Sequence, residues 1–428
     1  MTTEKGGVML LRSDFMKRLK IVVLLLFGSA FLAVFCGCAL PEEMLRYQPG
    51  STESVKIGLV LPLSGADASQ GRKMFNGARF AAEEINSKRG HFGRKVELIV
   101  EDSCSSGPGA AAAFEKVVKS GAVGVVGAYS TTEARRMTGL ARRFRVPLVI
   151  AMATGNDEVI GGNRFVFRSV FTDKQQARMI AGYMKYFRRV KRIVVTVSAD
   201  PGDLYSRNVA RDVTRAFRDL GGQVVAVSEI NKKFPDKLLQ EAVALAPDAI
   251  VLPFRAAEAA RYYKILRKNG YVGLICGPDS WDDPEFAKAL QGLKKTGVNF
   301  YTAFFSTETR HWEFSQFWEN FRKKSFYYPD SCEIQTFDAV NMLLIGLGNN
   351  ARNLRLFQKN WQGMRKHVGA AAVYTMKPKN EIDRTIHINR IGVDRESGDK
   401  FVSRNLVSLQ YSRLEDYNAV SKDKDEEE

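Results

Sequence analysis

The sequence predicts an α/β protein made of two doubly wound lobes, each a parallel sheet covered by helices. Apolar strands alternate with helices from residue 55 onward, and two such sets follow one another. Small and polar residues gather where the strands end. The 428 residues are comfortable for two domains. Consecutive strand–helix units of this kind form parallel sheets with helices on both faces.

The first set of units runs to about residue 172. Its predicted strands are Val55–Leu63, Val96–Val100, Ala122–Val126, Pro147–Ile150 and Arg164–Ser169. The first helix is indicated by apolar residues at helical spacing, namely Phe75, Ala78, Ala81, Ala82 and Ile85. A second helix is predicted over Ala110–Val118, and a third follows the turn at residues 127–132.

The second set repeats the pattern. Its predicted strands are Arg192–Ser198, Gln223–Val227 and Asp248–Leu252, followed by a short one at Leu274–Ile275. Helices are predicted over Leu204–Leu220, Asp236–Leu245 and Ala256–Asn269, the last closed by Gly270 as a C-cap. Beyond Gly297 we expect two helices, Trp312–Lys324 and Ile334–Gly346, and a terminal hairpin, His387–Val393 with Phe401–Leu409.

The N-terminus has the pattern of an export signal. Basic residues at 16–20 precede the apolar stretch Ile21–Phe35, which is short for a membrane span. The stretch ends in Phe-Cys-Gly-Cys38, which resembles the lipobox of bacterial lipoproteins and implies that Cys38 is lipidated. A plain signal peptide or an N-terminal anchor helix is the alternative.

These patterns divide the chain as follows. We expect a lipoprotein signal peptide at 1–37, a tether at 38–54, one lobe from 55–172 and 300–370, the other from 173–299 and 371–412, and a disordered acidic tail at 413–428.

The net charge does not indicate nucleic-acid binding. Cleavage before Cys38 would remove five basic and two acidic residues, which lowers the formal charge from +17 to +14. The remaining Lys and Arg residues are spread over helix faces and loops without a long basic tract, and the chain carries an export signal. We read the charge as a solvated basic surface.

The cysteines do not form a disulfide scaffold. Only Cys104, Cys276 and Cys332 remain after Cys38, so at most one pair can form. Cys276 and Cys332 are the candidate pair, and three reduced thiols are the equal alternative.

No catalytic or metal-binding pattern is present in the sequence. The four histidines have no metal-ligand spacing, and the chain lacks a Gly-x-Ser-x-Gly elbow, a Walker A loop and a Gly-x-Gly-x-x-Gly after the first strand. We therefore expect no enzyme, no metal and no cofactor.

The strand ends carry the resemblance to a family. The segments concerned are 61–65 (LPLSG), 76–86 (NGARFAAEEIN), 93–102 (GRKVELIVED), 125–127 (VVG), 145–149 (RVPLV), 167–168 (FR) and 337–340 (FDAV). In this order and spacing they resemble the type I periplasmic binding proteins, in particular the leucine/isoleucine/valine-binding branch. The resemblance covers roughly residues 55–347.

The resemblance implies two lobes joined by three crossovers that close over a small ligand. It implies an exported monomer, anchored through Cys38 and facing the periplasm or cell exterior, that delivers an amino acid or related small carboxylate to an ABC permease. The same fold acting as a non-transport envelope sensor or regulator is the alternative.

The first lobe is expected to supply the carboxylate site. Strand-end N–H groups and hydroxyls at helix N-termini bind anions. The matching turns contain Ser130 with Thr131, and Met152 and Ala153 with Thr154. The resemblance makes Thr131 and Thr154 the carboxylate-binding residues. The alternative is that these hydroxyls only cap helices.

The second lobe is expected to supply the other half. The resemblance places Tyr205 over the ligand and makes Asp279 the partner of its ammonium, a charge-assisted contact. The alternatives are an ordinary aromatic residue at a helix start, and an aspartate that caps the helix after Pro284.

Three positions depart from the family pattern. Met152 stands where a small residue is common, and Ser130 removes the usual partner of Cys104. Arg255 replaces part of a Gly-rich, aromatic strand end. Directed inward, Arg255 would pair with a second acidic group on the ligand; we favour the alternative, an outward, surface position.

Overall fold

The computed structural model describes residues 53–291, 293, 297–306, 312–394 and 400–410. The predicted signal peptide, Cys38 and the predicted acidic tail lie outside these residues. Within the described part of the chain, no helix combines the length and the apolar character needed to cross a membrane.

The first lobe is built on a five-stranded parallel sheet, as the sequence predicts. The strand order is β2-β1-β3-β4-β5, and every pairing is parallel. The strands are β1 (Val55–Leu61), β2 (Val96–Asp102), β3 (Gly124–Gly127), β4 (Leu148–Ile150) and β5 (Val166–Arg168). Strands β3, β4 and β5 are buried along their whole length, which explains why they read as continuous apolar runs.

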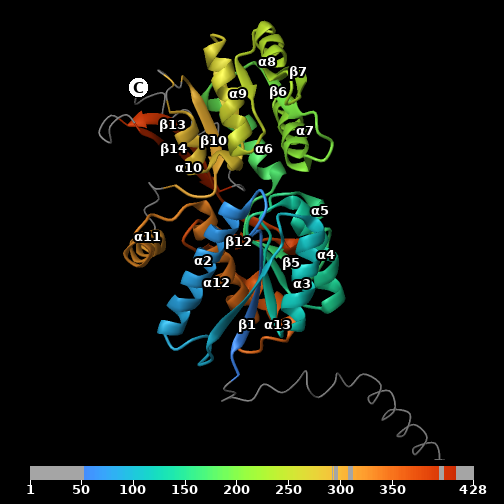
Figure 1. The fold of residues 1–428 in the computed structure, drawn as a ribbon, viewed down its shortest axis with the longest axis vertical. Coiled ribbons are helices and arrows are strands. Elements are labelled where there is room, and N and C mark those ends of the chain that lie inside the picture. The colour runs from blue at the N-terminus through green and yellow to red at the C-terminus, as the bar shows by residue number, and fades with distance from the viewer. Residues whose placement is uncertain (1–52, 292, 294–296, 307–311, 395–399, 411–428) are drawn as a thin grey trace, which may run out of the picture. The chain divides into compact units, whose positions relative to one another are not determined.

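Helices cover both sides of this sheet. They are α2 (Ala68–Ser87), α3 (Gly107–Lys119), α4 (Thr131–Phe144), the short α5 (Asp157–Ile160), α12 (Ser331–Leu347) and α13 (Leu354–Gly363). In Figure 1, α2 and α12 lie on one side of β1, and α3 and α4 lie on the other. Helix α2 approaches α12 closely at Gly77, where a Cβ atom would stand 2.2 Å from the Glu333 carbonyl oxygen.

The second sheet is mixed and has nine strands, and its parallel part forms the second lobe. Five strands are mutually parallel in the order β7-β6-β8-β9-β10, namely β6 (Arg192–Ser198), β7 (Gln223–Ile230), β8 (Ala249–Val251), β9 (Leu274–Gly277) and β10 (Asn299–Ala303). The other four pair antiparallel, namely β11 (His367–Val368), β12 (Val373–Met376), β13 (Ile382–Asp394) and β14 (Lys400–Gln410).

The second sheet contains antiparallel strands because its last strands are joined as a hairpin and not through crossover helices. Strands β13 and β14 form the predicted terminal hairpin, and a hairpin needs no crossover helix. The lobe boundary predicted at residue 300 falls inside strand β10. This strand pairs with β9 and β13, so the whole of β10 lies in the second sheet. The chain therefore leaves the second sheet after Ala303.

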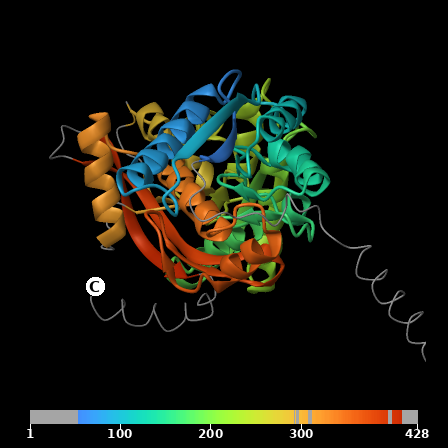
Figure 2. The same ribbon diagram turned by 90° about the horizontal axis from the view of Figure 1, so that it is seen from below.

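The helices of the second lobe are α6 (Asp173–Gly182), α7 (Leu204–Asp219), α8 (Pro235–Ala244), α9 (Ala256–Lys268) and α10 (Pro284–Ala289). Three of them, α7, α8 and α9, agree with the predicted segments to within a residue or two, whereas the sequence predicts no helix over α6. A π-helical turn, Tyr183–Phe187, follows α6, and a 3-10 turn, Asp279–Trp281, follows β9. Helix α11 (Trp312–Ser325) precedes α12, and a 3-10 turn at Pro378–Asn380 precedes β13. Figure 2 shows β13 and β14, coloured red, curving along one side.

The segments that pass between the lobes meet at Arg384. Its guanidinium donates to the carbonyl oxygen of Ser169 at 3.1 Å, to that of Phe304 at 2.5 Å and to the side chain of Gln335 at 2.6 Å. Arg384 is itself fully buried in β13. One side chain thus connects the segment after β5, the segment after β10 and strand β13.

The three cysteines in the described residues are free thiols. Cys276 is buried with its Sγ 3.8 Å from Met184 Sδ, and Cys332 is buried with its thiol donating to Gln70 Oε1 at 3.2 Å. Cys104 is exposed and also free. The candidate Cys276–Cys332 disulfide is therefore absent, because the two thiols pack against different partners.

Candidate functional site

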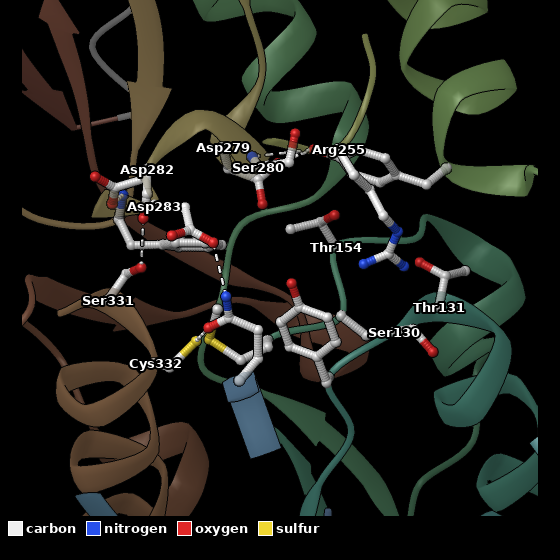
Figure 3. A pocket seen from close by; sticks show the side chains of 16 residues that line it. Ser130, Thr131, Thr154, Arg255, Asp279, Ser280, Asp282, Asp283, Ser331 and Cys332 are labelled. Atoms are coloured by element: carbon white, nitrogen blue, oxygen red, sulfur yellow. Dashed lines mark hydrogen bonds between the residues drawn. The ribbon is translucent and has the colours of Figure 1, made fainter. Parts of the chain in front are cut away.

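A cavity of about 60 Å³ lies where the strand ends of the two lobes face each other. The residues predicted as a binding site all line it, namely Ser130, Thr131, Met152, Ala153, Thr154, Tyr205 and Asp279. The cavity is further lined by Gln70, Tyr129, Arg255, Ser280, Asp282, Asp283, Phe304, Ser331 and Cys332. Figure 3 shows that these side chains come from both lobes.

Helix α4 begins at the cavity. Ser130 is its N-cap and forms a capping box with Glu133, so this hydroxyl is engaged in capping. Thr131 is the first residue of the helix, and its Oγ1 accepts a hydrogen bond of 3.2 Å from Gly155 N. Because that oxygen accepts, its own proton can be donated to a ligand. Of the two hydroxyls, Thr131 is better placed to bind an anion.

Thr154 lies beside a buried carboxylate. Asp173, the first residue of α6, is fully buried, and burial raises its pKa to about 7. This raised pKa also includes the effect of the nearby charge of Asp279, which raises it, and of hydrogen bonds with Thr154 and Gln176, which lower it. The Thr154 hydroxyl thus stabilises the ionised form of Asp173 from the edge of the cavity.

Tyr205 and Asp279 are joined across the second lobe. The Tyr205 hydroxyl donates to Asp279 Oδ1 at 2.8 Å and accepts from Ser280 N at 3.3 Å. Burial raises the pKa of Asp279 to about 6, and hydrogen bonds from Tyr205 and Gln176 oppose that rise. Asp283, not Asp279, caps helix α10, so the capping alternative for Asp279 is not what the structure shows.

Arg255 lines the cavity while its side chain stays 45% exposed, so it combines the inward direction with the surface position that we favoured. Its guanidinium lies 5.4 Å from the ring centroid of Tyr129 and 3.5 Å from Asp67 Oδ1, both in the first lobe. Figure 3 shows it directed toward Thr131 and Thr154. Since Arg255 begins the turn into α9, it extends from the second lobe across to the first.

The sequence reading missed the opposite end of the cavity, where the lobes also touch. Gln70 Nε2 donates to Asp283 Oδ2 at 2.7 Å, and Ser331 Oγ donates to the Asp282 carbonyl oxygen at 3.0 Å. Asp282 and Asp283 follow the same turn as Asp279, which was a usable signal. Gln70 and Ser331 lie near helix starts and become part of the site only through the approach of the lobes.

A second cavity, of about 330 Å³, lies at the other end of the second sheet. None of the predicted site residues lines it. Within the described ranges, no group of three or more His, Cys, Asp or Glu residues is arranged to hold a metal ion.

Comparison with known proteins places the chain in a family. The model of the periplasmic binding protein family matches residues 54–349, which is more than half of the chain. The chain belongs to this family. The fold of its solved members agrees: the branched-chain amino acid transporter substrate binding protein LivJ from Streptococcus pneumoniae, in complex with isoleucine, superposes with a TM-score of 0.73 at 22% identity, covering 83% of this chain and 100% of LivJ.

Curated relatives of this periplasmic binding protein are more similar in sequence. The Leu/Ile/Val-binding protein BraC3 of Rhizobium johnstonii is 31% identical over 43% of this chain and 49% of its own length. The Leu/Ile/Val-binding protein homolog 3 of Brucella melitensis biotype 1 is 28% identical over 58% of this chain and 67% of its own. The match therefore spans about half to two thirds of these relatives.

Family membership confirms several predictions. The architecture is that of the type I periplasmic binding proteins. Members of the family are solute-binding proteins that work outside the cytoplasm, so this chain is a binding protein and not an enzyme.

Proposed function

We propose that this protein is an extracytoplasmic receptor that captures an amino acid or a related small carboxylate between its closing lobes and delivers it to an ABC importer. The observation that carries the proposal is the cavity between the lobes. It joins Thr131 and Thr154 of the first lobe to Arg255 and Asp279 of the second, so that hydroxyls and a guanidinium suited to an anion share one cavity with an acidic residue. An α-amino acid carries the complementary pair of charges.

Each cavity residue has a role in this proposal. The Thr131 hydroxyl, which accepts from Gly155 N, donates to the ligand's carboxylate, and Thr154 acts beside it. Asp279 accepts from the ammonium, a contact strengthened by exclusion of water. Tyr205 holds the carboxylate of Asp279 in place through its hydrogen bond, and Met152 and Ala153 line the cavity next to the ligand.

Binding to purified protein tests this proposal. We expect at least one amino acid or small carboxylate to raise the melting temperature and to titrate by calorimetry. Thr154→Ala and Asp279→Ala should each weaken binding by roughly 1–3 kcal/mol, because each leaves a buried polar group of the ligand without its partner. Unchanged affinity in both variants would refute the site, and a panel without any binding compound would refute the function.

Delivery and anchoring are further parts of the proposal. Lipidation at Cys38 would hold a monomeric receptor at the membrane, where a permease could accept its ligand. The support is the lipobox-like segment and the family's association with ABC transporters. In cells of the source organism, Cys38→Ala should abolish lipid labelling and release the protein from the membrane fraction. Deletion of the gene should reduce uptake of the bound compound.

A further inference from the structure

The two ends of the cavity differ in charge. Figure 3 shows Arg255 directed toward Thr131 and Thr154 at one end, and Asp282 and Asp283 at the other. Asp279 lies between these ends. A receptor for an aliphatic amino acid needs an apolar surface at the end that takes the side chain, because burying polar groups against methyl groups leaves them unsatisfied.

The Arg255 end is prepared for an anion. A guanidinium carries five N–H donors, and among the described residues the Arg255 guanidinium makes one hydrogen bond, to Asp67 at the limiting distance of 3.5 Å. The aromatic face of Tyr129 holds the guanidinium in place without using its donors. The remaining donors face the same space as the Thr131 hydroxyl, so a carboxylate there can be bound by both lobes.

The opposite end is prepared for a cation. Asp283 accepts from Gln70 Nε2 at 2.7 Å and from Glu285 N at 2.9 Å, and Asp282 Oδ2 accepts from Phe304 N at 3.3 Å. A carboxylate can accept about four hydrogen bonds, so both groups retain acceptor capacity. Burial is the main cause that raises the pKa of each.

Nearby charges of the protein do not offset this burial. The ammonium of Lys73 lowers the pKa of Asp283, but Lys73 is bonded to Asp330 at 2.6 Å, and the pKa of Asp283 stays raised. An additional positive charge at this end would stabilise both aspartates in their ionised form.

We propose that Arg255 binds the carboxylate of the ligand and that the ligand is an amino acid with a cationic side chain, whose terminal ammonium or guanidinium lies between Asp282 and Asp283. This inference rests on the proposed function, since it takes the cavity as the binding site. The cation would replace the Gln70 amide at Asp283.

Two ligand pairs isolate the charge at the side-chain end. Ornithine and norleucine differ in a terminal ammonium against a methyl group, as do 2,4-diaminobutyrate and norvaline. In calorimetry with the purified mature chain we expect the cationic member of at least one pair to bind tenfold or more tightly than its neutral member. 1,4-Diaminobutane, which is ornithine without the carboxylate, should bind at least tenfold more weakly than ornithine.

Variants test the two ends separately. Arg255→Met should weaken binding of the cationic amino acid tenfold or more, and Arg255→Lys should weaken it less. Asp283→Asn, which keeps a capping side chain at the start of α10, should reduce the preference for ornithine over norleucine. Arg352→Met, at an exposed arginine outside the cavity, is the matched control and should leave affinity unchanged.

Contrary outcomes separate the two proposals. Tighter binding of norleucine, leucine or isoleucine than of any cationic amino acid would overturn the inference while supporting the receptor function. The same holds if Arg255→Met binds as well as the unmodified protein. If no amino acid or small carboxylate binds at all, the proposed function itself fails.

Discussion

The hydroxyl of Tyr205 donates a hydrogen bond of 2.8 Å to Asp279 Oδ1, which orients the carboxylate toward the cavity. Tyr205→Phe keeps the ring and removes this donor. Since the hydrogen bond lowers the pKa of Asp279, its loss should raise that pKa above about 6 and leave less carboxylate ionised near neutral pH. We expect ligand affinity at pH 7 to fall about tenfold, equivalent to about 1.4 kcal/mol, by calorimetry.

The control for this variant is Tyr328→Phe, which removes a hydroxyl from a tyrosine that is 53% exposed and outside the cavity. It should bind normally. Equal affinities of Tyr205→Phe and the unmodified protein would show that the hydroxyl does not prepare Asp279 for a ligand.

Stability without ligand should fall as the pH rises. In the folded chain the pKa of Asp173 is about 7 and that of Asp279 about 6, whereas both lie near 4 in an unfolded chain. Between these values the folded state binds more protons than the unfolded state, so the free energy of unfolding decreases as pH increases. The stabilisation is complete below about pH 4 and is lost as pH passes through about 7.

Asp173→Asn tests the origin of this slope. Asparagine has nearly the same shape and carries no charge, so it should raise the free energy of unfolding at pH 8 by roughly 1–3 kcal/mol and change it little at pH 4. Urea unfolding at both pH values measures the difference. An unaltered pH profile in the variant would rule out Asp173 as a source of the slope.

Gly77→Ala should separate α2 from α12. The added Cβ would stand 2.2 Å from the Glu333 carbonyl oxygen, a distance that requires the helix backbones to move. We expect the free energy of unfolding to fall by about 1–3 kcal/mol.

The matched control is Gly139→Ala in the middle of α4, where a Cβ would meet no atom within 4 Å. There the helix preference of alanine should raise stability by about 0.5–1 kcal/mol. Thermal or urea unfolding of both variants would reveal the opposite signs, and two changes of the same sign would contradict the packing argument.

Arg384→Met should weaken the junction between the lobes. It leaves the carbonyl oxygens of Ser169 and Phe304 and the side chain of Gln335 without their buried donor. We expect a loss of about 2–4 kcal/mol in the free energy of unfolding. Arg352→Met, at an exposed position, should stay within about 0.5 kcal/mol of the unmodified protein. Equal stability of the two variants would contradict the role of Arg384.

Most of the fold could be predicted because its signals are local. Alternating apolar strands and amphipathic helices specify parallel units, and Gly270 and the capping residues mark helix ends over a few residues. The antiparallel pairing of β10 with β13 could not be predicted in the same way. Pairing between Tyr301 and Asn389 joins residues far apart in the chain, and no local pattern specifies it.

In the candidate site, too, some features could be predicted from the sequence and others could not. Thr131, Thr154 and Asp279 were predicted because the turns after their strands match the binding positions of the family, and the ends of parallel strands meet at one edge of a sheet. That Ser130 caps α4 while Thr131 faces the cavity depends on side-chain direction, which spacing does not reveal.

The sequence by itself determined the two α/β lobes, the edge of each sheet at which a ligand would lie, and the residues that follow those strands. Only the tertiary structure decided that Arg255 turns into the cavity, that Gln70 reaches Asp283, and that Arg384 connects the segments between the lobes. The physical reason is the distance along the sequence over which each interaction acts. Strand and helix patterns act over a few neighbouring residues, whereas these contacts exist only once two separately folded lobes come together.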